Sequence, residues 1–248
     1  MPPSPPPIPA AIVLAFRDLA AVVRALPGLV VTAAAVYAAA DLVVAFAGAI
    51  VRPVSAFILT YFVAALCQLF LLTPFFIAVH RFVILGETAG HFAPAPGEPR
   101  FQKYFAISAA FAAVVAAPFF AGDWWLSDAG SMLGIVWNIV VLLATLRVAT
   151  VFPAIAVDAS CAGLGRAYAD LTGRAGRVVA VALPVLLPIM LVPVLSVRAV
   201  STLFEGNLFA RLIVELGNGV IDTVVEILFL VIVSRLYLWS GADTHPTD

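Results

Sequence analysis

Two carboxylates, Asp222 and Glu226, lie four residues apart inside an apolar run, GVIDTVVEILFL, at residues 219–230. Residues four apart share one face of a helix, so the two acids would form a polar stripe on an otherwise apolar segment. A charged side chain that faces lipid costs at least about 2.5–3.5 kcal/mol on insertion scales. The two acids are therefore expected to face protein or water, where they are candidates for ligand or proton chemistry.

Other polar residues are expected in the same outer half of the membrane. The sequence predicts a polar intramembrane cluster made of Asp41, Asn138, Asp222 and Glu226. One interpretation is a site for a cation, a proton or a lipid headgroup. The other is a packing network, in which the acids pair with arginines or hydrogen-bond across helices. The sequence leaves both interpretations open.

A second candidate region lies where basic residues end the predicted spans on the cytoplasmic side. His80, Arg81 and Arg147 are candidate contacts for an anionic lipid phosphate. The alternative is that these side chains simply extend to the headgroup level, as long basic side chains do near helix ends.

The elements that carry these residues are expected to be membrane-spanning helices. Of 248 residues, 64% are hydrophobic and 11% are charged, whereas a soluble domain has about 45–50% apolar and about 25% charged residues. The apolar residues form runs of 20 or more, which is long enough to cross a bilayer. A formal net charge of −1 gives no sign of a nucleic-acid partner.

We therefore expect an all-α, polytopic membrane bundle of six transmembrane helices with interfacial amphipathic helices. One membrane domain would occupy residues 11–240, between a disordered proline-rich arm at 1–10 and a polar tail at 241–248. Residues 11–26 have the composition of an amphipathic helix that lies in the membrane interface. The expected spans are residues 28–51, 54–79, 101–122, 131–157, 178–197 and 215–239.

The basic residues predict the orientation of these spans. With both termini inside, ten basic residues fall on the cytoplasmic side and three on the outer side. An excess of Lys and Arg marks cytoplasmic loops. Arginine outnumbers lysine twelve to one and alanine is abundant, a bias typical of GC-rich bacterial genomes. We expect a multi-pass protein of the bacterial inner (cytoplasmic) membrane with cytoplasmic N- and C-termini.

Familiar catalytic motifs are missing from the sequence. It contains no H-E-x-x-H, no G-x-x-x-x-G-K and no G-x-S-x-G pattern. The three histidines are scattered, and the two cysteines have no metal-ligand spacing. We therefore expect no cofactor, no metal and no enzymatic activity.

Three stretches in order carry a resemblance to a known group: AVHRFVILGE (78–87), LRVATVFPAIAVD (146–158) and GRAYADLTGRAGRVV (165–179). This order resembles bacterial polytopic inner-membrane proteins that are YciC-like or similar to the membrane domain of glycerophosphodiester phosphodiesterases. The resemblance covers roughly residues 11–240 in layout. It implies a six-helix membrane domain without an agreed activity, and it transfers no catalytic residues.

Two functions are compatible with these features. The first is a non-enzymatic inner-membrane protein that acts as an accessory, structural or assembly partner, or in envelope homeostasis. The alternative is binding or transport of a lipid or small solute through a polar site in the bundle. The expected partners are the lipid bilayer, another membrane protein or complex, and a phospholipid, with no nucleic acid. Transport requires a water-accessible polar cavity, whereas a scaffold requires buried acids that are paired.

Overall fold

A computed structural model of the chain describes the conformation of most of its residues. The described residues are 6–51, 54–88, 92–118, 136–137, 140–141, 143–146, 148–159, 176, 179–181, 184–185, 188–189, 192 and 208–240. Within them the chain forms helices and no strand, which confirms the all-α prediction. The continuous helices are α1 (Ile8–Ala25), α2 (Pro27–Ile50), α3 (Val54–Leu85), α4 (Pro99–Ala116), α6 (Val151–Ala156) and α9 (Leu208–Ser240).

Three of these helices are long and apolar enough to cross a membrane. They contain the segments Pro27–Gly48, Ser55–Leu85 and Leu212–Ser240, of 22, 31 and 29 residues, and a bilayer core requires about 20. The expectation of membrane-spanning helices is thus supported for α2, α3 and α9. Six spans were expected, and the described part of the chain contains three candidates.

The other three expected spans do not appear as long apolar helices among the described residues. The expected span 101–122 corresponds to α4, which carries Arg100, Gln102 and Lys103 in its first turns and ends at Ala116. Its apolar part is therefore too short to count as a crossing by length and composition. The expected spans 131–157 and 178–197 fall largely outside the described residues.

The helix boundaries agree with the predicted segments to different degrees. α1 and α2 begin and end within three residues of the predicted segments 11–26 and 28–51. α3 continues past the expected end at residue 79 and includes Pro74 within its length. α9 begins at Leu208, seven residues before the expected start at 215. It is continuous through Gly217 and Gly219, which places the whole acidic stripe on one helix.

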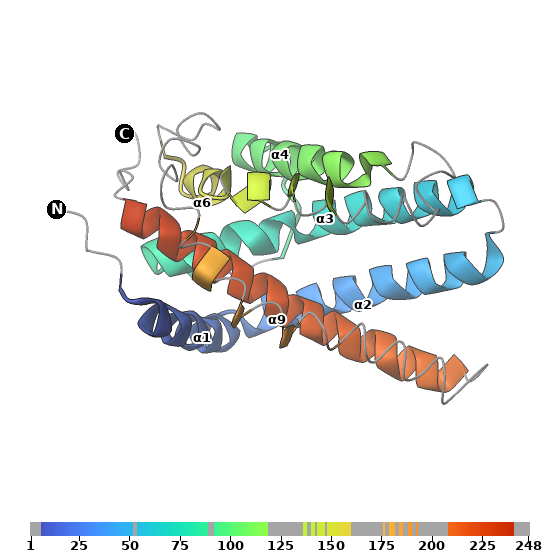
Figure 1. The fold of residues 1–248 in the computed structure, drawn as a ribbon, viewed down its shortest axis with the longest axis horizontal. Coiled ribbons are helices and arrows are strands. Elements are labelled where there is room, and N and C mark those ends of the chain that lie inside the picture. The colour runs from blue at the N-terminus through green and yellow to red at the C-terminus, as the bar shows by residue number, and fades with distance from the viewer. Residues whose placement is uncertain are drawn as a thin grey trace.

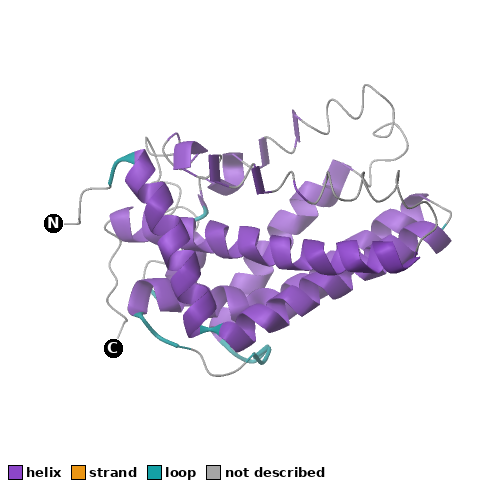
Figure 2. Ribbon diagram, turned by 90° about the horizontal axis from the view of Figure 1, so that it is seen from below, coloured by secondary structure: helices purple, strands orange, loops and turns teal. Residues whose placement is uncertain are grey.

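The bundle is built around α2, α3 and α9, which pack against one another (Figure 1). α2 runs antiparallel to both α3 and α9, as the colour progression along the ribbons in Figure 1 shows. α4 packs along α3, and α6 packs between α3, α4 and α9. α1 packs against α9 near the end of α9, at one end of the bundle, and the view in Figure 2 shows the same helical layers from below.

α2 and α9 approach each other most closely at a glycine. A Cβ atom on Gly219 would lie 2.6 Å from the backbone nitrogen of Ala38 and 2.8 Å from the carbonyl oxygen of Ala34. Both contacts are shorter than any side chain tolerates, so only glycine fits without a backbone shift. Small residues allow membrane helices to pack backbone to backbone. This crossing holds the polar face of α9 directly against α2.

Candidate functional site

The polar stripe of α9 lies along one side of a continuous helix. Glu215, Asn218, Asp222 and Glu226 follow one another at spacings of three or four residues. The Asn218 side-chain amide donates a hydrogen bond to Glu215 Oε2 at 3.3 Å. The local prediction that Asp222 and Glu226 share a face therefore agrees with the helix.

α2 presents a matching pair of polar side chains to this stripe. The Tyr37 hydroxyl lies beside the Glu226 carboxylate and interacts with it. Asp41, four residues further along α2, lies beside Asp222, four residues earlier along α9. Because the two helices run antiparallel, equal steps of four residues on each helix bring both pairs into contact. The structure thus joins three of the four predicted cluster residues through two helices.

The contact between Asp41 and Asp222 has a chemical consequence. A carboxylate has only acceptor atoms, so two carboxyl groups can hydrogen-bond to each other only when one of them carries a proton. The Asp41 Oδ2 atom is buried and has no hydrogen-bond partner within the described part of the molecule. The pair therefore retains an acceptor that a proton or a hydrogen-bond donor can satisfy.

The arginine ion pairs of the described residues lie away from these acids. They join arginines to Asp18, Glu87, Glu98 and Asp158. Within the described ranges, Asp41, Asp222 and Glu226 form no such pair. The described residues therefore do not form the acid–arginine version of a packing network, whereas the contacts of these acids across α2 and α9 are compatible with its other version, polar contact between helices.

A cavity of about 320 Å³ lies beside the carboxyl pair, and we name it the acidic cavity. It is formed by α2, α3 and α9 and contains Asp41, Glu215, Asn218 and Asp222 in its wall. Tyr61 and Gln68 of α3 complete the polar part of the lining.

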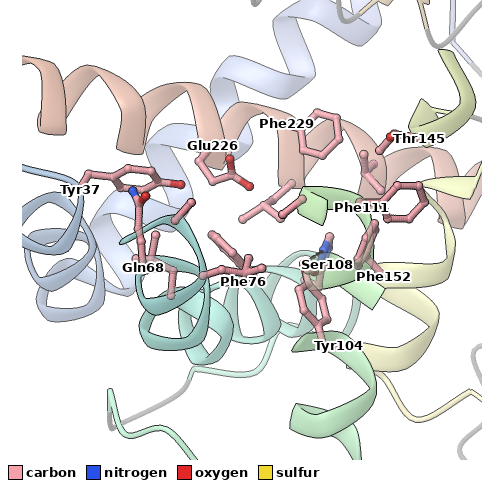
Figure 3. Close-up of a pocket in the computed structure, with 17 residues that line it drawn as sticks. Tyr37, Gln68, Phe76, Tyr104, Ser108, Phe111, Thr145, Phe152, Glu226 and Phe229 are labelled. Carbon is pink, nitrogen blue, oxygen red and sulfur yellow. Dashed lines mark hydrogen bonds between the residues drawn. The ribbon is translucent and has the colours of Figure 1, made fainter. Parts of the chain in front are cut away.

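A second cavity of about 280 Å³, the aromatic cavity, lies on the other side of Gln68. Figure 3 shows the Tyr37 hydroxyl and the Glu226 carboxylate at one side of it, and the rings of Phe111 and Phe152 at the other. Its aromatic wall consists of Tyr37, Phe76, Tyr104, Phe111, Phe152 and Phe229. One carboxylate thus lines a space whose wall includes six aromatic rings.

His80 supports the far wall of the aromatic cavity. Its side chain is fully buried, with Nδ1 2.7 Å from Ser234 Oγ and Nε2 3.2 Å from the Tyr104 hydroxyl. Ser234 Oγ donates its own proton to the Leu230 carbonyl at 2.8 Å. His80 Nδ1 must therefore donate to Ser234, which leaves Nε2 to accept the proton of Tyr104. The result is a directional chain of hydrogen bonds that fixes the Tyr104 ring.

The buried position of His80 does not agree with its expected lipid contact, whereas the expected lipid contact of Arg81 stays a prediction. His80 is enclosed on all sides, so its ring does not reach a lipid phosphate. The Arg81 guanidinium bonds Glu87 at 2.6 Å and the Ala156 carbonyl at 2.9 Å, and lies 3.6 Å from Asp158. The hydrogen bond from Arg81 to the Ala156 carbonyl joins the end of α3 to the end of α6.

Two predicted site residues, Asn138 and Arg147, lie outside the described residues. Three contributors were missed by the sequence analysis, namely Tyr37, Gln68 as a cavity residue, and Tyr104. The sequence could have predicted the role of Tyr37, since Tyr37 precedes Asp41 by four residues in a run of alanines and so shares its helix face. No sequence pattern predicts the roles of Tyr104 and Gln68, because these roles depend on how α3 and α4 are rotated toward the cavity.

The donor set of the acids does not match a metal site. No group of three or more His, Cys, Asp or Glu side chains in the described ranges could hold a metal ion. Three carboxyl groups beside an aromatic wall are suited to the binding of protons or of organic cations.

Comparison with known proteins assigns neither a family nor a function to this site. Scans against protein-family models, curated proteins and solved structures found no match for the chain. The resemblance to YciC-like proteins therefore stays a prediction. Function has to be argued from the site itself, since a fold alone does not specify an activity.

Proposed function

We propose that this chain is a non-enzymatic, multi-pass protein of the bacterial inner membrane that binds a small organic cation within its helix bundle. The aromatic cavity would hold the cation, and Glu226 would serve as its counter-ion. The observation that carries the proposal is that the Glu226 carboxylate faces a cavity of about 280 Å³ lined by six aromatic rings.

The lining of the aromatic cavity favours a cation over an anion or a neutral sugar. Aromatic faces carry negative electrostatic potential and attract ammonium groups by about 0.5–2 kcal/mol each, more when water is excluded. The Glu226 carboxyl group can supply the matching negative charge, and Arg81, Arg100 and Arg235 form their ion pairs with other carboxylates. An anion would meet the like charge of the Glu226 carboxylate at this position.

The hydrogen-bond polarity of the cavity supports the same conclusion. The Tyr104 hydroxyl pairs with His80 Nε2, the Thr145 hydroxyl donates to the Val141 carbonyl at 2.8 Å, and the Tyr37 hydroxyl lies beside the Glu226 carboxylate, an acceptor for its proton. Each of these hydroxyl groups therefore offers lone pairs to the cavity. A ligand that lacks acceptors and carries positive charge fits this arrangement best.

The membrane topology that we propose with this function has six spans and cytoplasmic termini. The distribution of ten basic residues against three between the two sides supports this orientation. The antiparallel arrangement of α2 with α3 and α9 is compatible with it. The end of α9 that carries Arg235, beside α1, would then face the cytoplasm.

Binding of benzyltrimethylammonium to the protein in lipid nanodiscs tests the proposal, with isothermal titration calorimetry as the readout. We expect saturable binding to the wild-type chain and a loss of at least about tenfold in affinity, about 1.4 kcal/mol, in Glu226→Gln. Glu98→Gln removes an exposed carboxylate outside the cavity and should bind as the wild type does.

An accessory role makes the opposite prediction for the same preparation. If benzyltrimethylammonium binds neither variant and a protein partner co-purifies in fixed stoichiometry from the native membrane, the acids serve packing and the proposal is wrong. Equal affinity in Glu226→Gln and the wild type would also contradict the assigned role of Glu226.

A further inference from the structure

A third cavity of about 720 Å³ lies between α2 and α3, and we name it the α2–α3 groove. Its lining is almost entirely aliphatic and contains Val43, Leu59 and Val63, whose side chains are about half exposed at 51%, 55% and 49%. Both helices are candidate membrane spans, and the half-exposed aliphatic side chains of the groove are suited to contact with hydrocarbon. Its volume falls in the range of about 300–1,000 Å³ that is typical of small-molecule sites.

The groove adjoins the acidic cavity across a thin partition. Ala40 of α2 and Ala64 of α3 line both spaces, and Gln68 lines the groove, the acidic cavity and the aromatic cavity. Alanine side chains are too short to separate neighbouring spaces fully. Gln68 is therefore the junction at which an apolar, lipid-facing groove meets two cavities that contain carboxyl groups.

These adjoining spaces differ sharply in chemistry. The groove offers aliphatic surface open to the bilayer, whereas the spaces behind Gln68 offer Asp41, Asp222 and Glu226. A ligand that satisfies both must have an apolar chain and a positively charged head. A diacyl phospholipid fits poorly, because its phosphate would meet the carboxyl groups.

We propose that the organic cation bound by this protein is a single-chain cationic amphiphile taken from the bilayer. Its chain lies in the α2–α3 groove, and its head passes Gln68 to reach the carboxyl groups. This inference rests on the proposed function, since it names the class of cation and the side from which the cation arrives. Cations dissolved in water would reach the aromatic cavity without using the groove.

Cys67 provides a native reporter inside the groove. It lines the groove and is exposed, with no disulfide partner among the described residues. A Cys161→Ser variant leaves Cys67 as the only thiol of the chain. The rate at which membrane-permeant N-ethylmaleimide alkylates Cys67 in nanodiscs then measures whether the groove is occupied.

At roughly ten times its half-saturating concentration, dodecyltrimethylammonium should lower the alkylation rate of Cys67 about tenfold. Benzyltrimethylammonium has a comparable head and no chain, so it should leave the rate unchanged while it competes with dodecyltrimethylammonium. Glu226→Gln should abolish protection, because the chain is retained through its head. Dodecanol controls for the effect of an added chain on the bilayer and should give no protection.

A matched pair of variants tests the partition. Ala64→Leu narrows the passage beside Gln68, whereas Ala35→Leu adds the same bulk to the groove away from the acidic cavity. We expect Ala64→Leu to reduce protection by dodecyltrimethylammonium at least about fivefold, because weaker binding leaves the groove less occupied at the same concentration. Ala35→Leu should have a smaller effect. Thermal unfolding of both variants shows whether they fold as the wild type does.

The outcomes separate this inference from the proposed function. If benzyltrimethylammonium binds but dodecyltrimethylammonium fails to protect Cys67, the cation reaches the site from water and the inference is wrong while the function stands. If protection persists in Glu226→Gln, the groove merely accepts lipid-like chains, and the inference is also wrong. Failure of both cations to bind the wild type would overturn the proposed function itself.

Discussion

Arg235 near the end of α9 holds Asp18 of α1 in a two-point ion pair. Arg235 Nε lies 2.6 Å from Asp18 Oδ2, and Nη2 lies 2.8 Å from Oδ1. The Asp18 side chain is only 13% exposed and the Arg235 side chain 31%. Paired hydrogen bonds between a guanidinium and a carboxylate fix geometry as well as charge. This contact determines where the N-terminal helix sits against the bundle.

Removal of one partner should loosen α1. Asp18→Asn leaves the partly buried guanidinium without its charge partner, and we expect a loss of about 1.5–3 kcal/mol in stability, as for hydrogen bonds to charged groups. Arg17 and Arg24 of α1 are exposed, so trypsin cleavage at these residues in nanodiscs should accelerate. The double variant Asp18→Asn/Arg235→Gln should lose less than the sum of the two single losses. Strict additivity would show that the pair does not anchor α1.

The α2–α9 crossing predicts a strong difference between two glycines of the same helix. Gly219→Ala places a Cβ against the backbone of α2 and should cost about 1–3 kcal/mol, since overpacking forces a shift of the helices. Gly217→Ala meets no atom within 4 Å and should be neutral, or stabilising by up to about 1 kcal/mol, because alanine favours helix. Thermal unfolding in nanodiscs compares them. Equal effects of both substitutions would argue against the close crossing.

The hydrogen-bond chain through His80 makes a separate prediction about stability. His80→Phe leaves the buried Tyr104 hydroxyl without its acceptor and should cost about 1–3 kcal/mol. Adding Tyr104→Phe removes the stranded hydroxyl and should recover part of that loss. Chemical or thermal unfolding of the three variants measures the recovery. If the double variant is as unstable as the sum of both singles, Tyr104 does not depend on His80.

The carboxyl pair on α2 and α9 should tolerate an amide better than an aliphatic residue. In Asp41→Asn the amide donates to the Asp222 carboxylate, so the contact survives without a shared proton and stability should stay within about 0.5 kcal/mol. The leucine in Asp41→Leu has nearly the same size as aspartate but offers no donor to Asp222. We expect this variant to lose about 1–3 kcal/mol of stability, because the Asp222 carboxyl group is left unsatisfied. A large loss in Asp41→Asn would indicate that the full charge of Asp41 is needed in the folded state.

The composition and local periodicity of the chain determined much of its architecture. The long apolar runs predicted the helices α2, α3 and α9, since apolar segments of this length are stable in lipid only as helices. The spacing of Asp222 and Glu226 placed both acids on one face, because helix geometry is a local property. The start of α9 was predicted seven residues too late, because the segment 208–214, which contains the charged residue Arg211, continues the helix.

The tertiary structure alone decided which side chains meet. Apart from Asp41, α2 carries no charged residue, and most of α3 is apolar, so their sequences specify the inward face only loosely, and the contact of Tyr37 with Glu226 depends on that rotation. His80 was expected at the lipid surface because it ends an apolar run, yet packing of α4 and α9 encloses it. Asp18 and Arg235 lie 217 positions apart, and no local pattern relates them. Helix rotation and register are set by packing across the bundle, which is why the sequence predicted the acids and only the structure revealed their partners.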